Sequence, residues 1–241
     1  MTRWRRHLII PDVQLRPGVS YAHLGWIRNY IAEKRPDVVV CLGDFADMAS
    51  LSSYDKGKLG GEGKRYAADV AASRAGMELL TERWGYKPRK ELTLGNHEYR
   101  IDRAAEENPA LFGTISTVDL GYERHGWTVR PFLKPVHIDG ISYAHYFVSG
   151  VMGRPVSSAA ALLRARHGSA VMGHVQKVDI AIHPATQHIA LMAGICYLHD
   201  EPYLTPQGNS CKRGIWLLNE VRNGVADPMF VSLGYLKRKY S

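Results

Sequence analysis

Five apolar runs in this chain of 241 residues each end beside a residue that can bind a divalent metal. In chain order these residues are Asp12, Asp44, Asn96, His145 and His174. The carboxyl ends of parallel strands meet along one edge of an open α/β sheet, and ligands bind there. Residues that are far apart in sequence are therefore expected to converge on one pocket. Its oxygen and imidazole ligands suit divalent metals that act on phosphate esters.

The segments between these runs predict the elements that position the ligands. Residues 20–34 have apolar residues spaced by about 3.6, which indicates a helix between strands at 7–11 and 38–42. Such a β-α-β unit is expected to pair its strands in parallel through a right-handed crossover. Further helices are expected at 66–84, 101–107 and 157–167, and further strands at 91–94, 169–172, 178–182, 188–193, 214–219 and 229–232.

Length and composition indicate one globular domain. The hydrophobic fraction of 45% and the charged fraction of 22% are typical of soluble globular proteins. We expect a single domain over 1–241, with loop or cap inserts at 48–66 and 100–127. The first insert contains a basic, glycine-rich loop that is expected to be flexible. The basic tail at 234–241 is expected to be loosely held.

Charge and cysteine content limit the classes of partner and compartment. Lys and Arg number 31 against 23 Asp and Glu, so the net charge is +8. This balance favours anionic partners such as nucleic acid, or it serves solubility alone. Three cysteines without CxxC spacing predict that the fold has no disulfide framework. No signal-type segment or run of about 18 apolar residues is present, so we expect a cytoplasmic protein without a membrane partner. The oligomeric state stays open.

The order of the ligand motifs resembles the calcineurin-like metallophosphoesterase superfamily. The matching motifs are Asp12, G-D-x-x-D at 43–47, G-N-H-E at 95–98, His145 and G-H at 173–174, and the resemblance covers Asp12 to Gln176. Either central motif alone is an ordinary turn sequence, but both in this order are specific. The resemblance implies an α/β fold, in which a metallophosphoesterase-like β-sheet sandwich is flanked by helices. It places the metal site at the carboxyl ends of the strands.

The resemblance also implies a site for two divalent metal ions. The first ion would be held by Asp12, Gln14, Asp44 and Gln176, and the second by Asp44, Asn96, His145 and His174. Asp44 would bridge the ions. His97 would be the general acid or would stabilise the transition state, because imidazole titrates near neutral pH. Taken singly, these residues have ordinary alternatives, since aspartate caps helices and asparagine tolerates left-handed turns.

Three more residues receive supporting roles. The resemblance implies that Asp47 and Glu98 support the loop of Asn96 and His97 without binding metal. Arg100 has a planar guanidinium that suits a substrate phosphate, although a solvent-facing arginine at a helix start is an equal alternative. The basic loop at 56–65 either covers a polyanion or is simply solvated.

The chain departs from the family at two ligand positions. Gln14 and Gln176 stand where the family usually has histidine, and both belong to the first metal. Oxygen ligands favour Mn²⁺, Mg²⁺ or Ca²⁺ over Zn²⁺ or Fe. We therefore expect a tight second site and a weak, exchangeable first site, with manganese as the favoured ion.

Several functions remain open at this point. The leading hypothesis is a hydrolase, namely a metal-dependent phosphodiesterase that cleaves nucleic acid or nucleotides with two metal ions. A phosphomonoesterase for small molecules or phosphoproteins is the alternative within this class. A non-catalytic metal-binding scaffold and a nucleic-acid-binding module without hydrolysis are alternatives from other classes.

Overall fold

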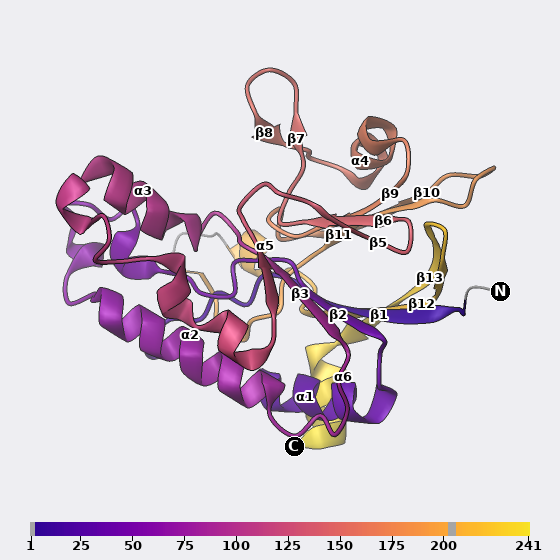
Figure 1. Cartoon of the computed structure of the whole chain (residues 1–241), viewed down its shortest axis with the longest axis horizontal. Coiled ribbons are helices and arrows are strands. Elements are labelled where there is room, and N and C mark those ends of the chain that lie inside the picture. Colours follow the sequence, from indigo (N-terminus) through magenta and orange to yellow (C-terminus); the bar gives the residue numbers. More distant parts are fainter. Residues whose placement is uncertain (1–2, 202–205) are drawn as a thin grey trace.

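Two β-sheets pack face to face in this computed structural model, which describes residues 3–201 and 206–241, and helices cover the outer face of each sheet (Figure 1). The first sheet has six strands in the order β13-β12-β1-β2-β3-β4. Strands β1 to β4 are parallel, whereas β12 is antiparallel to both β1 and β13. The bounds are β1 Arg5–Ile10, β2 Val38–Cys41, β3 Arg89–Thr93, β4 Thr128–Arg130, β12 Gly214–Arg222 and β13 Val225–Ser232.

The second sheet has five strands in the order β10-β11-β9-β6-β5. Its central strands β6, β9 and β11 are parallel, and β5 and β6 form an antiparallel hairpin that turns at Asp139 and Gly140. The bounds are β5 Val136–Ile138, β6 Ile141–Ala144, β9 Ser169–Met172, β10 Val178–Ile182 and β11 Ile189–Ala193. A small separate hairpin joins β7 Val148–Ser149 and β8 Arg154–Pro155.

Alternation of side chains along the strands builds the layers. In β1, Leu8 and Ile10 pack into the core beneath the helices, while Ile9 packs into the core between the two sheets. In β2, Val39 likewise packs into the core beneath the helices and Val40 into the core between the sheets. Because successive side chains point to opposite faces, a strand buried on both faces reads as a continuous apolar run. This is why the sequence shows unbroken apolar runs before the ligand residues.

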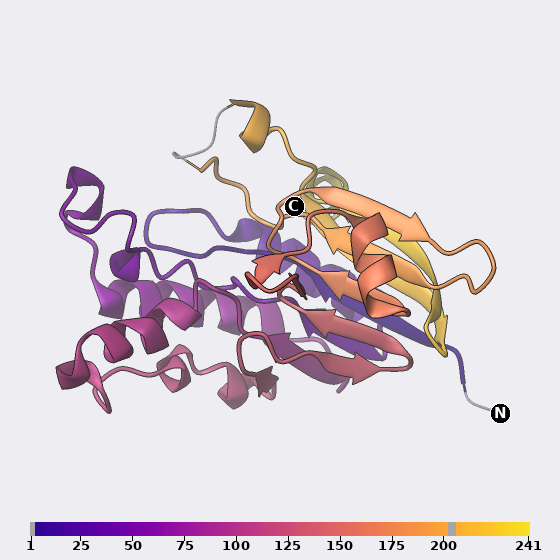
Figure 2. The ribbon, with the colours of Figure 1, turned by 90° about the horizontal axis from the view of Figure 1, so that it is seen from above.

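Helices complete the outer layers (Figures 1 and 2). Three helices pack against the six-stranded sheet: α1 Ala22–Lys34, α2 Tyr66–Thr81 and α6 Leu233–Tyr240. Helix α4 Ala159–Arg166 packs against the five-stranded sheet. Helix α3 Tyr99–Glu107 starts directly after the third ligand loop. The remaining helices are short. They are the 3-10 helices η1 Ala49–Leu51, η2 Leu59–Gly61, η3 Pro109–Leu111, η4 Thr117–Leu120 and η5 Tyr122–His125, and the one-turn helix α5 Pro206–Asn209.

The expected α/β sandwich flanked by helices is confirmed, and so is the parallel β-α-β unit at its start. The strand and helix positions agree with the sequence within a few residues. Residues 49–62 and 100–107 of the two expected inserts line one shared cavity of about 580 Å³. The domain extent and the role of these inserts stay predictions. Across the described residues, no helix combines the length and apolarity that crossing a membrane requires.

The expectation of a loosely held tail is wrong. Residues 233–240 form helix α6, in which Leu233 and Leu236 are buried. Near its end, Lys239 Nζ and Tyr240 Oη each donate to the Glu33 carboxylate of α1 at 2.7 Å. The many basic residues of this segment suggested a solvated tail, but they occupy the outer face of an amphipathic helix.

Candidate metal centre

Close backbone approaches place the ligand loops against one another. A Cβ added to Gly95 would lie 2.0 Å from Asp44 Oδ1, and one added to Gly173 would lie 2.4 Å from Asp12 Oδ1. Only glycine avoids these overlaps. Gly95, before Asn96, and Gly173, before His174, thus each let a carboxylate lie directly over their backbone.

Four ligand candidates have left-handed backbone conformations. The φ angles are 49° at Gln14, 47° at Asp44, 64° at His174 and 57° at Gln176. Non-glycine residues adopt this region at a cost of about 1–3 kcal/mol each, and such residues cluster at functional sites. The surrounding hydrogen bonds hold them there, as when the backbone N–H of Gln14 donates to Asp44 O at 2.7 Å.

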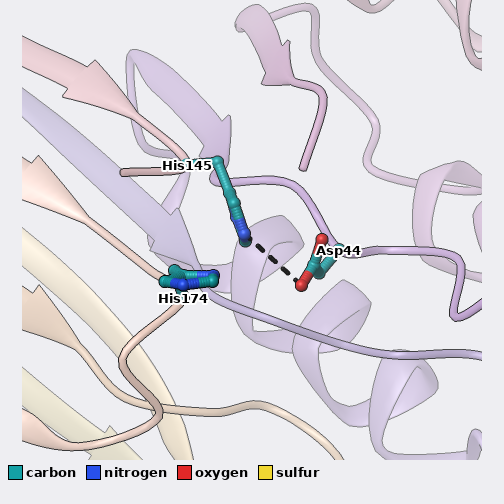
Figure 3. A group of neighbouring side chains, drawn as sticks. All are labelled: Asp44, His145 and His174. Carbon is teal, nitrogen blue, oxygen red and sulfur yellow. Dashed lines mark ion pairs between the residues drawn. The ribbon is translucent and has the colours of Figure 1, made fainter. Parts of the chain in front are cut away.

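The side chains of Asp44, His145 and His174 point toward one another (Figure 3), and one ligand atom from each lies within 4.8 Å of the others. Asp44 Oδ2 is 3.4 Å from His145 Nε2. Asn96 Oδ1 is 2.9 Å from His145 Nε2 and 2.8 Å from His174 Nδ1. Leu42 O accepts from His145 Nδ1 at 2.9 Å, which directs Nε2 into the cluster. These four ligand candidates come together from β2, β3, β6 and β9.

The other residues of the expected first site, Asp12, Gln14 and Gln176, lie on the loops that adjoin this cluster. Asp12 is fully buried, and its Oδ1 accepts from the His174 N–H at 3.1 Å. Within the described residues, neither Asp12 Oδ2 nor the amide atoms of Gln14 have a hydrogen-bond partner, although all are buried. Such orphaned atoms cost about 1–3 kcal/mol each, and a cation would satisfy the oxygens. Gln176 is half-buried, and its Oε1 accepts from Tyr197 Oη at 3.5 Å.

Glu98 fixes the loop geometry from beneath. Its buried carboxylate accepts backbone N–H groups from two of the ligand loops at once. These donors are Asp44, Phe45, Ala46 and Gly95, at distances of 2.7 to 3.0 Å. Both carboxylate oxygens of Glu98 thus accept backbone N–H groups of these loops, and its supporting role stays a prediction.

His97 lies at the edge of the cluster. Its Nδ1 is 2.9 Å from Asp47 Oδ1, and its Nε2 is 3.7 Å from Asp44 Oδ2. Arg100 Nη2 is 3.1 Å from His97 Nε2, and Arg100 Nη1 donates to Asp47 O at 2.8 Å. Arg100 thus packs against His97 and is not a solvent-facing arginine.

Three residues near the site, Arg16, His199 and Glu201, escaped the sequence analysis. Arg16 lies between the carboxylates of Asp47 and Glu201, and His199 Nε2 is 2.7 Å from Glu201 Oε1. No motif marks these residues, because their contact depends on how distant segments pack. A row of aromatic side chains beside His145 and His174 was missed for the same reason.

Charge coupling within the cluster shifts several pKa values. Burial alone would raise the pKa of Asp44, but the imidazoles of His145 and His97 outweigh it and lower that pKa. Burial opposes protonation of His145, yet Asp44 raises its pKa to about 9. Burial and the neighbouring His145 lower the pKa of His174 to about 4. Burial raises the pKa of Asp12 to about 7. Asp44 is therefore anionic beside His145, and a cation next to Asp12 would stabilise the charged form that burial disfavours.

No family model and no curated protein matches this chain. One solved crystal structure aligns with a TM-score of 0.50 and 13% identity, over 96% of this chain and all of its own. At this identity the likeness shows a shared fold alone. Wild-type Vps29 from Entamoeba histolytica, solved in complex with Zn²⁺, aligns with a TM-score of 0.42 and 12% identity. That alignment covers 95% of this chain and 99% of the other.

Proposed function

We propose that this chain is a metal-dependent phosphoesterase, and more specifically a phosphodiesterase that acts on nucleic acid or nucleotides. One observation carries the proposal. Ligand atoms of Asp44, Asn96, His145 and His174 converge at the carboxyl ends of four strands, with His97 at their edge. The motif resemblance to the calcineurin-like superfamily supports the same reaction class.

The donor atoms fit divalent cations. Asp44, Asn96, His145 and His174 would hold one ion, and Asp12, Gln14, Asp44 and Gln176 would hold another. Asp12 Oδ2 and Gln14 Oε1, which have no partner among the described residues, support the second of these sets. Bound divalent ions supply Lewis acidity to phosphoryl oxygens and make a water more acidic. Mn²⁺ accepts both imidazole and oxygen ligands, so it is the ion we favour.

His97 and Arg100 would act on the substrate itself. His97 Nδ1 lies 2.9 Å from Asp47 Oδ1, and Nε2 lies 3.7 Å from Asp44 Oδ2. Because Arg100 donates to Nε2 here, the leaving oxygen would receive a proton from Nε2 only when the ring is protonated at both nitrogens and Arg100 has turned to the phosphoryl group. The Arg100 guanidinium, 3.1 Å from that nitrogen, would attract a phosphoryl oxygen to the same place.

The basic loop contributes less to substrate choice than its composition suggests. Lys64 Nζ lies 2.7 Å from Asp55 Oδ2, and Lys56 Nζ lies 3.9 Å from Glu107 Oε2. These partners reduce the positive charge that the loop offers to a polyanion. The net charge of +8 remains the support for a polyanionic or nucleotide substrate.

The test uses chelator-treated protein assayed with chromogenic esters. After Mn²⁺ is added back, bis(p-nitrophenyl) phosphate should be hydrolysed faster than p-nitrophenyl phosphate. Hydrolysis in the opposite order would identify a phosphomonoesterase. A nuclease should also shorten a single-stranded oligonucleotide under the same conditions.

A non-catalytic metal-binding scaffold is the second candidate. The specific observation in its favour is that Gln14 and Gln176 occupy two positions of the first ligand set, because amides bind metal more weakly than imidazoles. Tight binding of one metal without turnover of either ester, and no effect of His97→Ala, would favour the scaffold.

A further inference from the structure

An unbroken row of aromatic rings leads from the ligand cluster to a surface groove. Tyr146 packs on His174 with ring centroids 4.6 Å apart, and Phe132 meets Tyr146 edge-on at 5.5 Å. Tyr99 then stacks on Phe132 at 5.0 Å with an interplanar angle of 23°. The Phe132 centroid is only 6.4 Å from that of His145, so the groove adjoins the candidate metal centre.

The groove has the size and lining of a small-molecule site. Its volume is about 510 Å³, and Tyr99 and Phe132 line it as half-buried rings. Apolar pockets of this size with a few polar groups are the usual form of ligand sites. Its other lining residues are Leu94, Asp102, Thr117, Glu123, Val129, Pro131 and Leu133.

The charges of the groove restrict the ligand. Asp102 and Glu123 contribute carboxylates, and none of the described residues that line the groove is lysine or arginine. A phosphate chain would be repelled here. Carboxylates accept hydrogen bonds from amino groups, and exposed aromatic rings stack on flat heterocycles.

We propose that this groove binds an amine-bearing nucleobase of a substrate whose phosphoryl group lies at the adjacent metal centre. The assignment of the phosphoryl group rests on the proposed function, whereas the base-binding groove stands on its own geometry. The base stacks on the Phe132–Tyr99 pair, whose rings already stack on each other, and Asp102 and Glu123 accept from its exocyclic amine. Phe132 and Tyr99 are therefore specificity-determining residues.

The larger cavity shared by 49–62 and 100–107 offers a weaker case. Two of its lining cations lie close to an acid, as in the pairs of Lys56 and of Arg103 with Glu107, at 3.9 and 3.8 Å. It also contains no aromatic residue among its described lining residues. It therefore provides neither a stacking surface nor an excess of free charge.

Calorimetry with three probes tests the proposal. In the presence of Mn²⁺, AMP should bind about tenfold more tightly than ribose 5-phosphate, because stacking on one or two aromatic side chains contributes on this scale. Adenosine, which has no phosphate, should bind measurably by itself. Phe132→Ala should lower AMP affinity about tenfold and leave ribose 5-phosphate unchanged. Phe112→Ala, at a ring that is 84% exposed and outside the groove, is the matched control and should change nothing.

A second variant and a second ligand pair keep the test decisive. Phe132→Leu preserves apolar volume without a ring, and it should lose the same affinity if the Ala variant does not fold. Cytidine should bind more tightly than uridine, because only cytosine carries the exocyclic amine. Equal affinities of AMP and ribose 5-phosphate, together with no adenosine binding, would overturn the proposal. Adenosine binding that Phe132→Leu abolishes, in a protein that hydrolyses no ester, would support the groove and refute the proposed function instead.

Discussion

Arg16 connects the loop of Asp47 to Glu201, which lies 185 residues beyond Arg16 in the chain. Arg16 Nη1 donates to Asp47 Oδ2 at 2.8 Å and to Glu201 Oε1 at 2.9 Å. The side chain of Arg16 is only 19% exposed, and those of its two partners are buried. Because Asp47 contacts His97 Nδ1, this arginine restrains the histidine through one intervening carboxylate.

Arg16→Ala should therefore lower kcat about tenfold or more with little change in KM. Residues that orient the groups around a metal site typically change activity by about 10–100-fold when they are mutated. Metal content should stay unchanged. Arg28→Ala, which breaks the Glu82 ion pair away from the site, is the matched control. Equal kcat values for the two variants, measured after both are shown to be folded, would contradict the positioning role.

Asp44→Asn should abolish turnover and weaken both metals. Asp44 would be the anion common to both ligand sets, and its carboxylate also accepts the His97 N–H at 2.9 Å. Elemental analysis after dialysis and an ester assay measure the two effects. Near-native activity and metal content would show that Asp44 is not the bridge.

His97→Asn should leave the metal content nearly unchanged while the rate falls by about 10²–10⁴-fold, the usual contribution of a general acid. The substitution keeps a polar side chain beside Asp47 but removes the titrating nitrogen. Loss of metal in parallel with the rate would instead make His97 a ligand.

Exchange of both glutamines tests whether the expected first metal site is weak. The double variant Gln14→His with Gln176→His should gain first-site affinity and prefer softer ions such as Zn²⁺, because imidazole is the better donor to them. After dialysis we expect close to one tight metal in the wild type and closer to two in the variant. Two tight metals in the wild type, or no gain in the variant, would contradict an oxygen-rich weak site.

His23 should make stability depend on pH. Burial lowers the pKa of this α1 histidine to about 3, and the nearby His199 acts in the same direction. The folded state thus binds fewer protons than the unfolded state between about pH 3 and 6.5, so stability is full above 6.5 and falls as the pH decreases. At pH 4.5 the loss should be on the order of 2–3 kcal/mol.

Urea unfolding of wild type and His23→Leu measures this contribution. Because leucine does not titrate, the variant should lose less free energy of unfolding between pH 7 and pH 4.5. Parallel losses in the two proteins would contradict a buried, neutral His23.

The sequence predicted the parts of this molecule that obey local rules. Apolar runs that end at Asp44 or His174 predict buried parallel strands, and parallel strands bring their carboxyl ends together. The contacts of Arg16 with Glu201 and of Phe132 with Tyr146 follow from the packing of separate segments, and no spacing in one segment reveals them. In the tail, the buried pair Leu233 and Leu236 is too short a pattern to outweigh the surrounding basic residues.

The place of β1 in its sheet has a consequence for how the chain folds. β1 is an interior strand, yet one of its neighbours is β12, and Arg5 pairs with Val221 near the other end of the chain. During synthesis the first strand therefore has one edge unpaired until β12, with Val221, has left the ribosome. Long-range pairing of this kind slows folding and exposes a strand edge to aggregation in the meantime. The loop with Asp12, which follows β1 directly, would acquire its final position only when that late partner docks.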